Sequence, residues 1–132
     1  NLPVEGMAKD YGRTRTAPLA GLEVRIDKDE AGSARFVVVL PYRYIWMKSK
    51  GDGFETSLDV DLKVVDESGA EVWSFVRSYP LEVHKGRLKA ALTESFTAEA
   101  VAPLKPGSYR LKATVVNSND GSKASFEQAF DL

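Results

Sequence analysis

Residues 57–64 read Ser57-Leu58-Asp59-Val60-Asp61-Leu62-Lys63-Val64, the clearest pattern in the chain. Polar and apolar residues alternate at every position. Side chains of a β-strand point to opposite faces in turn, whereas those of a helix return to one face about every 3.6 residues. The stretch therefore predicts a strand with one face in a core, formed by Leu58, Val60, Leu62 and Val64, and the other face in solvent.

The same period of two recurs on both sides of this stretch. Further strands are predicted at residues 22–27, 35–40, 42–47, 70–79, 81–83, 88–101, 109–115 and 124–130. Turns rich in Gly, Asp and Asn separate them, at residues 28–33, 50–53, 66–69, 84–87 and 117–121. Many short strands with little helix favour an all-β antiparallel sandwich of about seven to nine strands over an alternating strand and helix fold.

Two of these boundaries depend on composition rather than on period. Pro80 is expected to end or bend its strand, because proline has no N–H to donate to a sheet. Residues 88–101 are rich in Ala, Leu, Glu and Lys, which favour helix, but their apolar positions fit a period of two better. A strand is therefore predicted there.

The length of 132 residues suits one domain with one core. Residues 1–18 show no sustained period and are predicted to be an irregular N-terminal arm or linker, so that the sandwich occupies residues 19–132. The start at Asn1 rather than Met indicates a processed protein or a domain cut from a longer one. The longest apolar run, residues 36–40, is far shorter than the roughly 20 residues that span a bilayer, so no membrane insertion is expected.

Composition restricts the chemistry further. The chain has no Cys and one His, which removes disulfides, thiol catalysis and Cys/His zinc sites. Its formal net charge of -1 provides no overall basic field for nucleic acid, although five arginines lie in the first third, at positions 13, 15, 25, 35 and 43. No cofactor, metal site or nucleic-acid partner is expected.

Residues 104–109 read Leu-Lys-Pro-Gly-Ser-Tyr, or L-x-P-G-x-Y, at the start of a predicted strand. This motif resembles the turn before the penultimate strand of fibronectin type III and other immunoglobulin-like sandwiches. In those folds a corner tyrosine packs inward and its hydroxyl bonds to upstream backbone. The resemblance implies an immunoglobulin-like topology in which Tyr109 serves folding rather than function.

A longer stretch is similar to a bacterial group. Residues 39–46 read Val-Leu-Pro-Tyr-Arg-Tyr-Ile-Trp and precede a Gly turn, an alternating strand, an Asp-x-x-Gly turn and the L-x-P-G-x-Y motif. That order resembles the β-sandwich domains of bacterial envelope proteins that carry GWxTD motifs, although the Gly-Trp-x-Thr-Asp string is absent. The resemblance implies an extracytoplasmic module, periplasmic or secreted, that binds a protein partner or a flanking domain of its own chain without catalysis.

Tyr42, Tyr44 and Trp46 are the candidate ligand-binding residues. Alternation would place all three rings on one face of a strand, where an exposed row could stack on sugar rings or grip a partner's side chains. The other interpretation is that the rings form the inner layer of the sandwich. Trp73, Phe75 and Tyr79 pose the same question. The leading hypothesis is a non-catalytic interaction module, and the alternative is a carbohydrate or small-ligand binding module.

Catalytic and calcium sites are weaker hypotheses. Asp59 and Asp61 would lie about 7 Å apart on one strand face, a spacing that suits glycoside hydrolysis, but a solvent-exposed face explains them as well. His84 lies in a predicted turn, where a solvated side chain is expected rather than a catalytic one. Oxygen-bearing loops, at Asp27, Asp29, Asp52 and Asp120, could form a loose calcium site, but the spacing matches no EF-hand loop.

Overall fold

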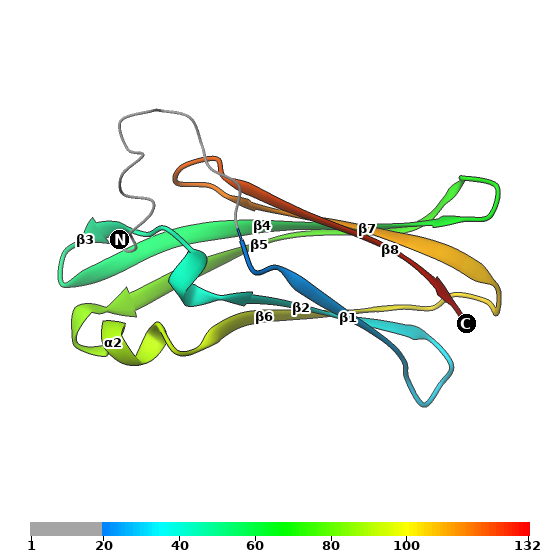
Figure 1. Ribbon diagram of the computed structural model, residues 1–132, viewed down its shortest axis with the longest axis horizontal. Helices are drawn as coiled ribbons and strands as arrows, with labels where there is room; N and C mark the ends of the chain where they lie inside the picture. The colour runs from blue at the N-terminus through cyan, green and yellow to red at the C-terminus, as the bar shows by residue number, and fades with distance from the viewer. Residues whose placement is uncertain (1–19) are drawn as a thin grey trace.

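The computed structural model describes residues 20–132, which form two antiparallel sheets packed face to face (Figure 1). The predicted arm over residues 1–18 lies outside the described residues. One sheet has the order β1-β2-β6, formed by Glu23–Lys28, Ala34–Pro41 and Ser95–Ala102. The other contains β3 (Lys48–Lys50), β4 (Gly53–Asp66), β5 (Glu71–His84), β7 (Ser108–Asn117) and β8 (Lys123–Asp131). These eight strands confirm the predicted all-β antiparallel sandwich.

Strand β4 is the centre of the larger sheet. It pairs with β5 along one side and with β7 and the short β3 along the other, so β5 and β8 are the outer strands. The alternation predicted for residues 57–64 is confirmed, because Leu58, Val60, Leu62 and Val64 are buried. Across the core they face the buried side chains of β2, which are Ala34, Phe36, Val38 and Leu40. Burying each large side chain of this kind contributes about 1.5–3 kcal/mol.

The turn at residues 66–69 shows how a local motif fixes a hairpin. One carboxylate oxygen of Asp66, Oδ1, accepts hydrogen bonds from the backbone N–H groups of Ser68 and Ala70 and from the Ser68 hydroxyl. These bonds hold the pKa of Asp66 below its ordinary value, with the Ser68 hydroxyl as the largest cause. Gly69 has a φ of 88°, a left-handed conformation that favours glycine. The predicted turns at 50–53 and 117–121 also connect paired strands.

The prediction that a strand ends at Pro80 was wrong, because β5 continues through it to His84. Pro80 lies opposite Ser57 in the ladder between β4 and β5. The N–H of Lys85 donates to the carbonyl of Asp52 in the same register, so the backbone groups of odd-numbered β5 residues point to β4 and those of even-numbered residues point outward. Pro80 therefore lacks an N–H only at the free edge, where none is needed.

The prediction of one strand over residues 88–101 was wrong in its first half. A turn of 3-10 helix, η2 (Lys85–Arg87), leads into a short helix, α2 (Leu88–Ala91), and only β6 is a strand. Leu88, Ala91 and Leu92 follow the three- and four-residue spacing of a helix and turn toward the protein. The helix-favouring composition of this segment decides its first turn, and the period of two holds from Ser95 onward.

The second aromatic row lies on the inner face of β5. The rings of Trp73 and Phe36 are 5.5 Å apart, and those of Tyr79 and Phe96 are 5.3 Å apart. Trp73, Phe75 and Tyr79 are only half-buried, because β5 is an outer strand. The corner tyrosine also behaves as expected, since the Tyr109 hydroxyl donates to the carbonyl of Lys105 at 2.6 Å.

In residues 20–132 no helix has the length and apolar character needed to cross a membrane.

Candidate functional site: an apolar pocket at one end of the sandwich

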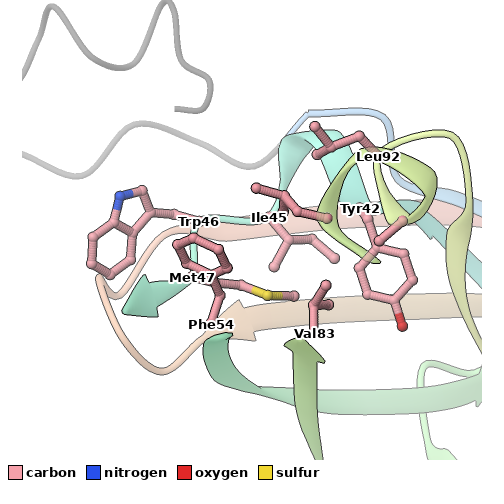
Figure 2. Close-up of a pocket in the computed structure, with 9 residues that line it drawn as sticks. Tyr42, Ile45, Trp46, Met47, Phe54, Val83 and Leu92 are labelled. Atoms are coloured by element: carbon pink, nitrogen blue, oxygen red, sulfur yellow. The ribbon is translucent and has the colours of Figure 1, made fainter. Parts of the chain in front are cut away.

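A pocket of about 120 Å³ opens at the end of the sandwich where α2 lies beside the chain after β2 (Figure 2). Its lining comes from four separate parts of the sequence. The side chains are Tyr42, Ile45, Trp46, Met47, Phe54, Val83, Leu88, Ala91 and Leu92. Figure 2 shows Tyr42 and Trp46 at opposite sides of the group, with Met47, Phe54 and Val83 between them. Eight of these nine residues are hydrophobic side chains without a hydroxyl, and the ninth is Tyr42.

The chain reaches this pocket by leaving the strand at Pro41. The N–H of Tyr42 still donates to the carbonyl of Glu94 at 3.0 Å, which extends the β2–β6 ladder by one pair. The next residues form a turn of 3-10 helix, η1 (Tyr42–Tyr44), closed by a bond from the N–H of Ile45 to the carbonyl of Tyr42 at 2.9 Å. Residues 42–47 are therefore not a strand, which corrects the prediction for this segment.

The helical turn separates the three predicted binding residues. A 3-10 helix has about three residues per turn, so side chains two positions apart point in different directions. Tyr42 and Trp46 line the pocket, whereas Tyr44 packs beside Gly21. The Arg43 guanidinium carbon lies 4.7 Å from the centre of the Tyr44 ring. The rings do not form the single row that alternation predicts, but two of the three belong to one site.

Gly21 allows the close approach of Tyr44. A Cβ atom at this position would lie 2.6 Å from two carbon atoms of the Tyr44 ring, and the backbone has a φ of 80°. Both the contact and the conformation favour glycine there. The described chain thus begins against η1, next to the segment that supplies the pocket.

Trp46 stands at the rim, with 40% of the residue exposed, and its backbone is held by a buried amide. The side-chain N–H of Asn117 donates to the Trp46 carbonyl at 2.9 Å. The amide oxygen of Asn117 accepts from the Thr56 hydroxyl at 2.5 Å and from the N–H of Asn119 at 3.1 Å. Asn117 is 0% exposed, so these bonds are its only means of satisfying a polar group removed from water. The network fixes the rim of the pocket to the β7–β8 turn.

Electrostatics favour an uncharged occupant. The lining contains no carboxylate, imidazole or ammonium group, and its side-chain donors are the Tyr42 hydroxyl and the Trp46 indole N–H. Burial raises the pKa of Tyr42 above its ordinary value of 10.0, and the charge of Glu94 adds to this effect. Tyr42 is therefore a neutral phenol at physiological pH. The pocket can therefore remove an apolar group from water without placing it against a charge.

The residues of the catalytic hypotheses do not line this pocket, and His84 lies far from the two aspartates. Asp59 and Asp61 are on the outer face of β4, where Asp59 accepts a bond from the Ser78 hydroxyl at 2.6 Å and Lys63 Nζ lies 3.5 Å from Asp61. His84 pairs with Gly53, six residues along β4 from Asp59, or about 20 Å at the strand rise. Nδ1 of His84 accepts from the N–H of Gly86.

The loop acids and arginines also have local partners. Asp29 and Asp120 accept bonds within their own turns, from Ala31 and Ser33 and from Ser122 respectively. Within residues 20–132, no three His, Cys, Asp or Glu side chains gather as a metal site would require. Arg25 pairs with Glu23 and Arg35 with Glu99, while Arg13 and Arg15 lie outside the described residues.

Sequence reasoning identified Tyr42 and Trp46 but missed the rest of the site. Leu88, Ala91 and Leu92 carried a signal in their helical spacing. Asn117 carried none, because its partners Thr56 and Trp46 are 61 and 71 residues away.

No protein-family model matches the chain, and the search of curated proteins finds no match.

Proposed function

We propose that this domain is a non-catalytic interaction module that takes an apolar side chain of a protein partner, or of a flanking domain of its own chain, into the pocket at the end of the sandwich. The observation that carries the proposal is the lining, in which apolar groups surround about 120 Å³ of space and an exposed Trp46 stands at the rim. Tryptophan and tyrosine beside an apolar pocket are typical of residues that contribute strongly to protein interfaces.

The size of the pocket fits a single side chain. A cavity of about 150 Å³ lined by aliphatic and aromatic groups stays dry and accepts benzene. A pocket of about 120 Å³ therefore suits a leucine, methionine or phenylalanine side chain. Burying such a side chain would contribute about 1.5–3 kcal/mol, which suits one anchor within a larger contact rather than a whole interface.

The strand order, which we propose is immunoglobulin-like, supports the proposal. The three-stranded sheet β1-β2-β6 corresponds in order to strands A, B and E of such folds, and β5-β4-β7-β8 corresponds to a C′, C, F and G sheet. The bond from the Tyr109 hydroxyl to the Lys105 carbonyl matches the tyrosine corner. Sandwiches of this kind commonly present their binding residues at the ends, where the loops cluster.

The location that we propose is extracytoplasmic, in the periplasm or outside a bacterial cell. It follows from the resemblance of residues 35–130 to the sandwich domains of bacterial envelope proteins with GWxTD motifs. The absence of Cys from the chain is compatible with it, since the core holds by packing alone.

Capped amino acids test the proposal directly. N-acetyl amides of Leu, Met and Phe should shift the NMR signals of the Trp46 indole N–H and the Leu88 methyl groups, whereas those of Ser, Asp and Lys should not. Ala91→Leu fills the pocket and should weaken binding by more than about tenfold. Ala90→Leu is the matched control, because Ala90 is the exposed neighbour on the same helix and does not line the pocket. Equal binding by Ala91→Leu and Ala90→Leu would refute the proposal.

Carbohydrate binding is the second candidate, and it rests on the exposure of Tyr44 and Trp46, each 40%. An exposed aromatic ring can stack on a sugar ring. Against it, the pocket offers few polar groups for sugar hydroxyls. A glycan array with Trp46→Ala as the control separates the two functions: a hit that this variant loses would favour carbohydrate, and a blank array would favour the apolar side chain.

A further inference from the structure

Apart from the three-residue β3, the described residues have four strands at sheet edges, β1 and β6 in one sheet and β5 and β8 in the other. An edge strand carries backbone N–H and C=O groups that can pair with another strand. In β6 the N–H and C=O groups that point to the free edge belong to the odd-numbered residues. The bond from Tyr42 to Glu94 and the β2–β6 register direct the backbone of even-numbered residues toward β2, which leaves Ser95, Thr97, Glu99 and Val101 facing outward.

The other three edges carry features that discourage pairing. Strand β5 has Pro80 at its free edge, a bulge opposite Val64 and Val65, and the exposed cation Arg77 on its inner row. The edges of β1 and β8 are charged, with Glu23, Arg25, Asp27 and Lys28 on the first and Lys123, Glu127 and Asp131 on the second. Proline, bulges and edge charges are the means by which natural sheets prevent unwanted strand addition.

Strand β6 has the fewest of these features. It has no proline and no bulge in its eight paired residues. Its single charged side chain, Glu99, forms an ion pair with Arg35 of the neighbouring strand. The remaining outward side chains are Ser95, Thr97 and Val101, and Val101 is 46% exposed. A strand with mostly neutral side chains, whose outer backbone groups pair with no other described strand, is suited to accept a partner.

The two sheets also differ in width. The smaller sheet has no strand beyond β6 to cover the outer part of β5 in the described residues. Three strands cover the inner face of four, β5-β4-β7-β8. The inner row of β4 is buried from Thr56 to Val64. No residue of β5 is buried, and its inner side chains Trp73, Phe75, Tyr79 and Leu81 stay half-buried. The contact between Tyr79 and Phe96 places β5 across the sandwich from β6. A strand added beside β6 would cover the outer part of this row.

We infer that the β6 edge is a strand-addition site, which binds an extended segment of a partner protein with apolar residues at alternate positions. Side chains opposite Phe96, Ala98 and Ala100 would point inward against the half-buried row of β5. Side chains on the other face would lie opposite Thr97, Glu99 and Val101. A basic residue suits the position opposite Glu99, because cross-strand pairs of opposite charge are favourable.

Proline substitution tests this surface without breaking the fold. Thr97→Pro removes an N–H that points outward, so the β2–β6 ladder stays intact, as Pro80 does in β5. Ser125→Pro is the matched control, because Ser125 faces outward on the free edge of β8. Val101→Pro is a second blocking variant at the same edge, for use if Thr97→Pro unfolds.

The probe is a displayed library of random linear peptides, selected on the full chain. We expect enriched peptides with alternating apolar residues that bind the wild type and Ser125→Pro equally and bind Thr97→Pro more than about tenfold less tightly. Hydrogen exchange should show the amides of Glu99 and Val101 fast in the free protein and protected in the complex.

Three results would overturn the inference. The first is no enrichment of alternating peptides, or enriched peptides that bind Thr97→Pro as well as the wild type. The second is binding that Ala91→Leu abolishes and Thr97→Pro does not, which would support the pocket and not the edge. The third is slow exchange of the Glu99 and Val101 amides in the free protein, because another part of the chain or a second copy would then occupy the edge. If a second copy occupies the edge, the exchange rates of these amides depend on protein concentration, and if another part of the chain does, they do not.

Discussion

Asn117 joins the pocket rim to the end of β7 in the larger sheet. Its buried amide holds the Trp46 carbonyl and the Thr56 hydroxyl. Asn117→Ala leaves both without their partner, and one unsatisfied buried group costs about 1–3 kcal/mol. We expect the free energy of unfolding in urea to fall by about 2 kcal/mol or more. The Trp46 indole N–H signal should also shift, because the rim loses its anchor.

Asn119→Ala is the comparison for this prediction. Its side chain donates to the carbonyl of Glu55, in a partly exposed position where water can replace it. A loss of stability as large as that of Asn117→Ala would show that the buried amide has no special part in the rim.

Tyr42 predicts an alkaline limit to the stability of the pocket. Burial and Glu94 raise its pKa in the folded state, so the folded protein holds the phenol proton more tightly than the unfolded chain does. The contribution of the neutral phenol to the free energy of unfolding is fully present below the ordinary pKa of 10.0. It is lost as pH rises through the pKa of the folded state. Tyr42→Phe should therefore lose less stability above pH 10 than the wild type. Parallel unfolding curves for the two proteins across that range would contradict this.

The hydrogen bonds of single residues differ in how well the sequence predicts them. The bond of Tyr109 was expected because its acceptor, Lys105, lies four residues upstream in a turn with a recognisable motif. The role of Asn117 was not, because its contacts are made only after β3, β4 and the β7–β8 turn assemble. Local hydrogen bonds leave a sequence signal and distant ones do not.

The pairing of β5 predicts that proline costs little stability at Val76 and more at the next residue, Arg77. Val76 is 71% exposed, and its backbone points to the free edge, whereas the backbone of Arg77 points to Val60 of β4. Val76→Pro should change the free energy of unfolding by less than about 1 kcal/mol. Arg77→Pro should cost about 1–3 kcal/mol more, since it removes a ladder bond and leaves a carbonyl unpaired. Thermal or urea unfolding of both variants measures the difference, and similar losses would mean that the strand orientation is wrong.

Elements were predicted well where they follow a period of two over many residues. The inner row of β4 and the hairpin of β7 and β8 are examples. The two segments predicted wrongly are short turns of helix, η1 and α2, which each join strands. Four residues are too few to establish a helical period, and tertiary contacts at the pocket decide their conformation. These two short elements and the residues that cap them, Ile45 and Leu92, supply five of the nine lining residues.

The whole domain depends on one core between its two sheets. Leu62 lies at its centre and is 1% exposed. Leu62→Ala should lower the free energy of unfolding by about 2–5 kcal/mol, through the lost burial and the cavity that remains. Val76→Ala, at an exposed position of the outer strand, should change it by less than about 0.5 kcal/mol. Equal effects in urea unfolding would contradict the assignment of the inner face of β4.

For the molecule as a whole, the sequence predicts the sandwich but not the pocket. The sandwich follows from patterns that each strand carries on its own. The pocket needs Tyr42, Phe54, Val83 and Leu88 brought together from different elements, and no pattern in the sequence states that arrangement. The aromatic residues Tyr42 and Trp46 were identified by their type, and only the fold shows that Tyr44 does not join them.

The most direct test of the central claim is the location of a bound apolar side chain. Nuclear Overhauser effects between the methyl groups of N-acetyl-leucine amide and the protein measure it. The proposed function predicts effects to Val83, Leu88 and Ala91, which line the pocket, and their loss in Ala91→Leu. Effects confined to the exposed valines of β5, Val72 and Val76, or none to the pocket, would contradict it.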